Sequence, residues 1–179
     1  RLARSEPFTT TWNIPAFTKN EEVDPPDELL KNPLFTSLAD AELVLRFFAL
    51  RDAIINAKTG SLRRILDRYM ERKKDIEPTE VRALEYQFLS TLSRLVALFN
   101  QEPFRLPKTR RPSRPLYDAL MIALSLDPTL KIEDRKAEIR AALSSSLGKP
   151  DEYDVLVGRG NTIDAVRQRV SLATQILKS

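Results

Sequence analysis

Cysteine and histidine are absent from the 179-residue sequence, and only four glycines occur. Without cysteine, the chain has neither a disulfide framework nor a thiolate nucleophile. Without histidine, it lacks the base of Ser-His-Asp catalysis and the usual ligand of zinc and nuclease metal sites. The acidic residues are scattered, and no Asp or Glu pair has the spacing of a metal-ligand set. We therefore expect a chain that is not an enzyme and that uses no metal or cofactor.

An apolar stretch of about 20 residues, which a membrane-spanning helix needs, is also missing. The chain begins at Arg1 rather than at methionine, and its first residues do not have the pattern of a signal peptide. From these features we expect a cytoplasmic protein that does not enter a membrane. We also expect the chain to be a fragment of a longer protein.

Apolar residues make up 42% of the chain and charged residues 30%, which is typical of a soluble helical protein. The twelve prolines cluster between apolar segments and mark loops. The pattern predicts an all-α fold, with an irregular bundle of five to six helices over residues 37–179. An extended, proline-rich and irregular arm over residues 1–36 should precede it. Trp12 and Phe17 are the expected anchors of this arm on the helices.

The most apolar run covers residues 37–52, and its apolar side chains fall on every side of a helix. Such a helix is buried, so this run predicts the central helix of the bundle. Ser37 is its expected N-cap, with Asp40 three residues later. A buried Arg46 in the middle of the run needs a carboxylate, which Glu42 or Asp40 would supply as a structural ion pair. The alternative is a guanidinium that points at a partner domain or at a phosphate.

Helical periodicity recurs in the segments that follow. They cover residues 61–73, 78–100, 115–126, 132–147 and a last helix capped by Thr162, with Arg167 and Arg169 on its outer side. Residues 151–161 lack this pattern and predict a loop.

Basic residues are concentrated in residues 104–115, which carry five of them and no acidic residue. The whole chain has a formal charge of +4, so without this segment it would be −1. Such concentration is typical of a phosphate-binding patch, and a solvated loop that caps helix C-termini is an equal alternative. The first helix after residue 60 adds a weaker basic face. The candidate nucleic-acid-binding residues are Arg105, Lys108, Arg110, Arg111 and Arg114, with Arg63 and Arg64.

Residues 38–50, with the sequence LADAELVLRFFAL, resemble the D-x-E-L-x-L-R-F-x-A helix of the GmrSD-type restriction and phage-defence family. Weaker similarities follow in the same order: LRRILDRYM at 62–70, LYDALM at 116–121 and the segment 160–169. The resemblance implies a helical lobe that follows a ParB-like nucleotidase domain and packs on it. The family's nucleotidase motif and HNH nuclease site have no counterpart in this sequence, so no catalytic residue is carried over.

Two hypotheses follow. The favoured one is a non-catalytic helical lobe of a nucleotide-dependent antiphage or modification-dependent restriction protein. It would pack on the nucleotidase domain of the same protein and contact DNA through residues 104–115, so replacing Arg110, Arg111 and Arg114 with Ala should abolish salt-sensitive DNA binding. The alternative is a protein–protein interaction bundle that binds no nucleic acid.

Overall fold

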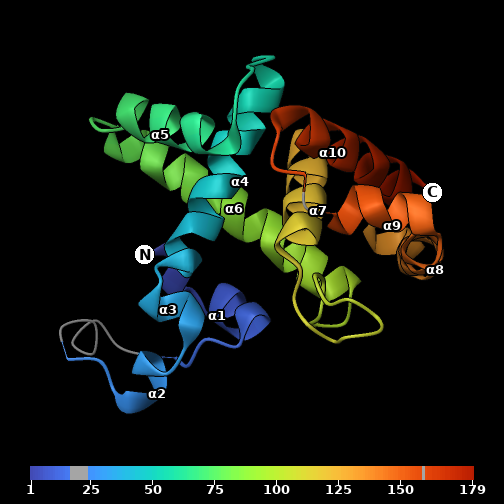
Figure 1. Ribbon diagram of the computed structural model, residues 1–179, viewed down its shortest axis with the longest axis horizontal. Coiled ribbons are helices and arrows are strands. Elements are labelled where there is room, and N and C mark those ends of the chain that lie inside the picture. Colours follow the sequence, from blue (N-terminus) through green and yellow to red (C-terminus); the bar gives the residue numbers. More distant parts are fainter. Residues whose placement is uncertain (17–23, 159) are drawn as a thin grey trace.

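The computed structural model describes residues 1–16, 24–158 and 160–179, and in these ranges the fold is all-α, without a β-strand (Figure 1). The all-α prediction is confirmed. Seven α-helices lie in the described part beyond residue 37, rather than five or six. They are α4 (Ala39–Ile55), α5 (Leu62–Arg72), α6 (Pro78–Leu98), α7 (Arg114–Leu126), α8 (Lys136–Gly148), α9 (Pro150–Val157) and α10 (Ile163–Lys178), with a 3-10 turn, η3 (Glu133–Arg135), before α8.

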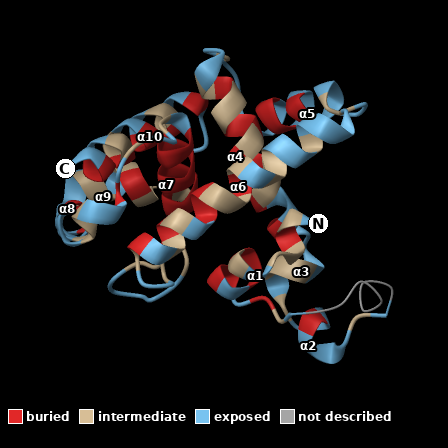
Figure 2. Cartoon of the chain, turned by 180° about the vertical axis from the view of Figure 1, so that it is seen from behind, coloured by how far each residue is buried: buried red, intermediate tan, exposed pale blue. Residues whose placement is uncertain are grey.

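The central helix is α7. Every residue from Leu116 to Ser125 is buried, and Figure 2 shows the helix red along this length. It packs against α4, α6, α9 and α10, which surround it in Figure 1. Each fully buried leucine side chain of such a helix contributes about 1.5–3 kcal/mol to stability relative to an exposed one.

The prediction that α4 is apolar and buried on all sides is wrong. Leu43, Phe47 and Leu50 are buried on one side, whereas Val44 and Leu45 are only half-buried. The central position in the bundle is taken by α7, so other helices cover only part of the surface of α4. Composition could not distinguish the two helices, since both carry apolar residues all round.

The start of α4 also differs from the prediction. Ser37 does not cap it. Ser37 follows the last residue of the short helix α3 (Pro33–Thr36), and its hydroxyl donates to the carbonyl of Pro33 (2.5 Å). The chain turns through Leu38, whose φ of 56° is in the left-handed region, and α4 begins at Ala39. Asp40 instead accepts from the backbone N–H of Ala41 (2.7 Å).

The N-terminal arm is more regular than predicted. Its described residues, 1–16 and 24–36, form a 3-10 turn, η1 (Leu2–Arg4), and three short helices: α1 (Glu6–Trp12), α2 (Asp27–Leu30) and α3. Phe8 and Trp12 on α1 are buried, one helical turn apart, so their packing favours a helix over an extended arm. Trp12 stacks on Phe104 and meets Tyr117 edge-on, with ring centroids 6.0 and 5.6 Å away. The predicted anchor Trp12 is confirmed, and Phe17 lies outside the described residues.

The predicted loop over residues 151–161 is wrong, because residues Pro150–Val157 form α9. Pro150 occupies the first turn, where its missing N–H costs nothing, and Asp151 and Glu152 face the positive end of the helix dipole. Leu156 anchors the helix in the core. Thr162 caps α10 by accepting from the N–H of Ala165 (3.2 Å), as predicted.

None of the helices in the described ranges has both the length and the apolar character needed to cross a bilayer.

The central position of α7 can be tested with two leucines of the same helix. Leu120→Ala should lower the free energy of unfolding by about 2–5 kcal/mol, because it leaves a cavity in the core. Leu126→Ala, at a side chain that is 37% exposed, should cost much less. Urea unfolding followed by circular dichroism measures both values, and equal losses would contradict the central position of α7.

Candidate nucleic-acid interface

The basic segment 104–115 is a closed loop whose two ends are held together. Arg105 and Pro112 form an antiparallel bridge, and the N–H of Ser113 donates to the carbonyl of Phe104 (2.8 Å). Phe104 and Ser113 are buried, so both ends of the loop are anchored in the core. The backbone N–H of Leu106 donates to the carbonyl of Arg111 (3.1 Å), which narrows the loop further. A pinned loop loses little conformational freedom when it binds a partner.

Two of the five predicted cations of this loop are engaged within the chain. Arg105 Nε lies 3.2 Å from Glu102 Oε1, and Arg110 forms an ion pair with the other oxygen of the same carboxylate. Arg105 Nη1 also donates to the carbonyl of Arg110 (2.7 Å). The two arginines therefore stabilise the loop and present less free charge than their number suggests.

The other three loop cations, Lys108, Arg111 and Arg114, are exposed, and none forms an ion pair with a described residue. Lys108 and Arg111 lie in the part of the loop beyond the Arg105–Pro112 bridge, and Arg114 is the first residue of α7. A cation at the start of a helix faces the positive end of its dipole, so Arg114 gains nothing from α7 itself. These three side chains form the exposed positive surface of the loop.

Arg114 also lines a groove of about 590 Å³ beside the loop. The groove brings together residues from the loop, α4, the start of α5 and the α9–α10 connection. Its lining residues are Glu42, Arg46, Leu62, Leu106, Pro112, Ser113, Arg114, Pro115, Val157, Gly158 and Asn161. Arg63 and Arg64 directly follow Leu62 and are exposed, but neither lines the groove, and Arg63 is 3.9 Å from Asp67.

Arg46 is buried beside this groove and pairs with a carboxylate that the sequence did not indicate. Its Nε donates to Oδ1 of Asp118 (3.1 Å), and its Nη2 binds Oδ2 of the same residue. Glu42 is a secondary partner, 3.7 Å from Nη1. The predicted pairing with Asp40 is wrong, because Asp40 accepts from Arg4 (2.7 Å). Asp118 is on α7, 72 positions from Arg46, so spacing along one helix could not have found it.

Burial and ion pairing act in opposite directions on the pKa values of Arg46 and Asp118. Burial alone would lower the pKa of Arg46, but Asp118 and Glu42 outweigh it and raise this pKa, so the guanidinium stays charged. Burial raises the pKa of Asp118 from its ordinary value, and the nearby Arg46 and Arg169 oppose that rise. We favour the ionised pair, because a fork that binds both carboxylate oxygens needs the deprotonated acid.

The sequence pattern predicted the wrong environment for Arg169. It was expected on the outer side of α10, yet it is only 2% exposed. It donates to the carbonyl of Val155 in α9 (3.2 Å) and to those of Gly158 (3.0 Å) and Gly160 (3.3 Å) in the α9–α10 connection. Burial lowers the pKa of Arg169, partly offset by Asp118. Arg169 therefore holds the backbone at Gly158, which lines the groove, and is itself too buried to meet a ligand. Arg167, the other predicted outer residue, is half-buried.

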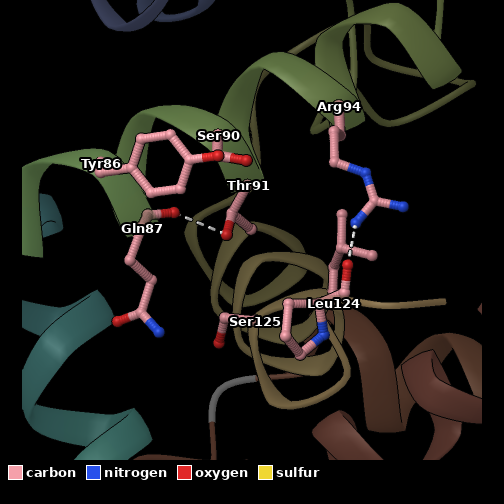
Figure 3. Close-up of a pocket in the computed structure, with 8 residues that line it drawn as sticks. Tyr86, Gln87, Ser90, Thr91, Arg94, Leu124 and Ser125 are labelled. Carbon is pink, nitrogen blue, oxygen red and sulfur yellow. Dashed lines mark hydrogen bonds between the residues drawn. The ribbon is translucent and has the colours of Figure 1, made fainter. Parts of the chain in front are cut away.

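A second cavity, of about 190 Å³, lies between α6 and α7 and is drawn in Figure 3. Three of its polar side chains, those of Thr91, Arg94 and Ser125, are hydrogen-bonded within the chain. Thr91 donates to the carbonyl of Gln87 (2.8 Å) and Ser125 to that of Ile122 (2.8 Å). Arg94 binds the carbonyl of Pro128 (2.9 Å) and Glu133 (2.7 Å). This cavity therefore has a structural explanation, since its arginine holds the α7–α8 connection against α6. Within the described ranges, no group of three or more acidic residues could hold a metal ion.

Asp118→Asn tests the buried ion pair. It leaves the Arg46 charge buried with weaker partners, so the free energy of unfolding should fall by about 3–5 kcal/mol. Glu42→Gln removes the half-exposed partner and should cost at most about 1 kcal/mol. Urea unfolding measures both variants. The double variant Arg46→Met with Asp118→Leu should recover much of the loss, because an apolar pair of similar size needs no charge compensation. Equal losses for Asp118→Asn and Glu42→Gln would contradict the assigned partner.

The chain was also compared with protein-family models, curated proteins and solved structures, and none of them matches it. The resemblance of residues 38–50 to the GmrSD-type family therefore stays a prediction. The loop and the groove beside it carry the functional argument.

Proposed function

We propose that this chain is a non-catalytic helical lobe that contacts the phosphate backbone of duplex DNA through the loop 104–115. The observation that carries the proposal is the set of three exposed cations, Lys108, Arg111 and Arg114, which have no acidic partner among the described residues. They sit on a loop that the Phe104 anchor and the Arg105–Pro112 bridge hold in place.

Phosphate contacts of this kind depend on charge and not on base sequence. Lysine and arginine displace the counterions condensed on DNA, so affinity falls steeply as salt rises. Arginine forks also match pairs of phosphate oxygens. The loop offers no Asn or Gln between residues 104 and 115, which are the usual readers of adenine edges. We therefore propose backbone binding with weak sequence preference.

The other predicted contacts take different roles in this proposal. Arg63 and Arg64 stand next to the groove and would extend the interface, since α5 begins where the groove ends. Arg105 and Arg110 support the loop through Glu102. The structural ion pair of Arg46 with Asp118 holds α7, the helix into which the loop leads, against α4.

The parent protein in this proposal is a cytoplasmic, nucleotide-dependent antiphage or restriction protein. The support is the resemblance of residues 38–50 to the GmrSD-type helix, and the proposed partner is an N-terminal nucleotidase domain of the same protein. A nucleotidase motif in the sequence that precedes Arg1 in the parent protein would support it, and an unrelated domain there would overturn it.

The alternative function, a protein-interaction bundle, is favoured by a different observation. Three large side chains are exposed, one on each of the helices α4, α5 and α6: Ile55, Met70 and Tyr86, at 54%, 54% and 75%. Apolar side chains at the surface often mark protein interfaces when they are contiguous. Salt-insensitive binding of a protein, with no DNA shift at low salt, would favour this function.

The DNA-binding proposal can be tested with a charge-matched pair of triple variants. Replacing Lys108, Arg111 and Arg114 with Gln should weaken binding to a labelled duplex and reduce the slope of log affinity against log salt by up to about 3, roughly one per lost contact. Fluorescence anisotropy across a salt series measures both quantities.

The control replaces Arg82, Lys131 and Lys136 with Gln, which removes the same charge elsewhere. It should change affinity little. If both triple variants bind alike, the loop is not the interface; if the unmodified chain does not bind DNA at low salt, the proposed function is wrong.

A further inference from the structure

A cavity of about 270 Å³ lies between the base of the loop 104–115 and α8. Three arginines from two parts of the chain line it: Arg105 and Arg110 from the loop, and Arg140 from α8. Glu102 is the one acidic residue among the described lining residues. The remaining lining residues are Phe99, Asn100, Pro103, Pro107, Leu143, Ser144 and Leu147. The described lining therefore holds three arginines and one carboxylate, which binds two of them, Arg105 and Arg110.

Glu102 occupies the position that an external anion would take between the two loop arginines. One of its oxygens is 3.2 Å from Arg105 Nε, and the other pairs with Arg110. The carboxylate is 39% exposed and the Arg110 side chain 66%, so a ligand can reach both. An exposed ion pair of this kind is worth little, because water and salt screen it.

Arg140 is the third cation, and its charge has no acidic partner in the described part of the chain. Its Nε donates to the carbonyl of Leu98, at the end of α6. No hydrogen bond to a described residue engages its two terminal nitrogens, so they are available to a ligand. A fixed guanidinium with free terminal N–H groups is well suited to phosphate.

Backbone strain is concentrated at the same place. Asn100, Gln101 and Arg110 have φ values of 53°, 71° and 55°, in the left-handed region that residues with a Cβ rarely adopt. Asn tolerates this region, but Gln and Arg have no such preference. Residues held in it tend to cluster at ligand clamps and switch regions. Here the strained positions flank Glu102 and include one of the arginines that it binds.

We propose that this cavity is a phosphate-binding site and that Glu102 is its internal competitor, displaced when a phosphate group binds Arg105, Arg110 and Arg140. A free phosphate ion has more oxygens and more negative charge than one carboxylate, so it satisfies three guanidinium groups better than Glu102 does. A DNA phosphodiester has a single charge, like Glu102, and it would displace the carboxylate because it can also bind Arg140, which has no acidic partner among the described residues. The source of the phosphate rests on the proposed function, in which a DNA backbone lies on the neighbouring loop. A free phosphate ion would bind through the same kind of oxygen atoms, and the experiment separates the two sources.

The test removes the competitor and, separately, the third arginine. Glu102→Gln should raise the affinity for a labelled duplex roughly two- to fivefold, the equivalent of one exposed ion pair. Arg140→Gln should lower it and reduce the salt slope by about 1. Two controls match these charge changes outside the cavity: Glu138→Gln, on the same helix α8, and Lys131→Gln. Anisotropy measures DNA binding, and an NMR titration of arginine side-chain N–H signals with inorganic phosphate measures the free ion.

The outcomes separate this inference from the proposed function. A gain with Glu102→Gln that Glu138→Gln does not reproduce supports the site with DNA as the source. Shifts of the arginine signals by inorganic phosphate, in a chain that does not bind DNA, support the site while the proposed function fails. Salt-sensitive DNA binding that is equal in Glu102→Gln and Glu138→Gln, with no response to inorganic phosphate, overturns the site and leaves the proposed function standing.

Discussion

The bidentate contact between Arg46 and Asp118 is the interaction on which the rest of the arrangement depends. Asp118 is on the central helix α7 and fully buried, so its charge needs a partner that is equally fixed. Arg46 supplies it from α4, and the Tyr117 hydroxyl adds a hydrogen bond to the carbonyl of Leu43 (3.0 Å). These contacts hold the first turns of α7 against α4. Because the loop 104–115 leads directly into α7, they also fix where the loop ends and how its cations are presented.

Helices with clear periodicity and a capping residue could be predicted from the sequence. Ser61 and Thr162 both accept from a backbone N–H three residues later, and α5 and α10 begin where these residues indicate. The start of α4 could not, because Ser37 serves the preceding short helix and only the tertiary path through Leu38 shows it. Short helices were missed for a related reason: α9 is too short for its apolar period to be visible, and the burial of Leu156 in the core is not a local property.

The position of the candidate site could be predicted from the sequence, but the ion pairs within and beside it could not. Charge density along the sequence identified residues 104–115, since five cations without an acid are unusual in any chain. It could not show that Glu102, just outside this segment, neutralises part of that charge through Arg105 and Arg110. Nor could it find Asp118, since an acid in an apolar helix far along the chain gives no sign of its partner. The fold decides which side chains form ion pairs. A count of basic residues in the sequence therefore gives only an upper limit on the number of cations that have no carboxylate partner.

The number of cations without a carboxylate partner also distinguishes the loop 104–115 from the basic face of α5. Residues 63–74, in α5 and the turn that follows it, carry six cations and two acids. Four of these cations have carboxylate partners: Arg63 lies 3.9 Å from Asp67, Arg72 binds Asp52, Lys73 binds Glu80 and Lys74 binds Glu71. A cation that already has a carboxylate partner must lose it before it can bind a phosphate, so it adds less to binding than a free one. Lys108, Arg111 and Arg114 have no such contact with any residue that the structure describes. The loop thus keeps three cations without an ion pair to a described residue, against two (Arg64 and Arg68) in residues 63–74, and for this reason we propose the loop as the anion-binding surface.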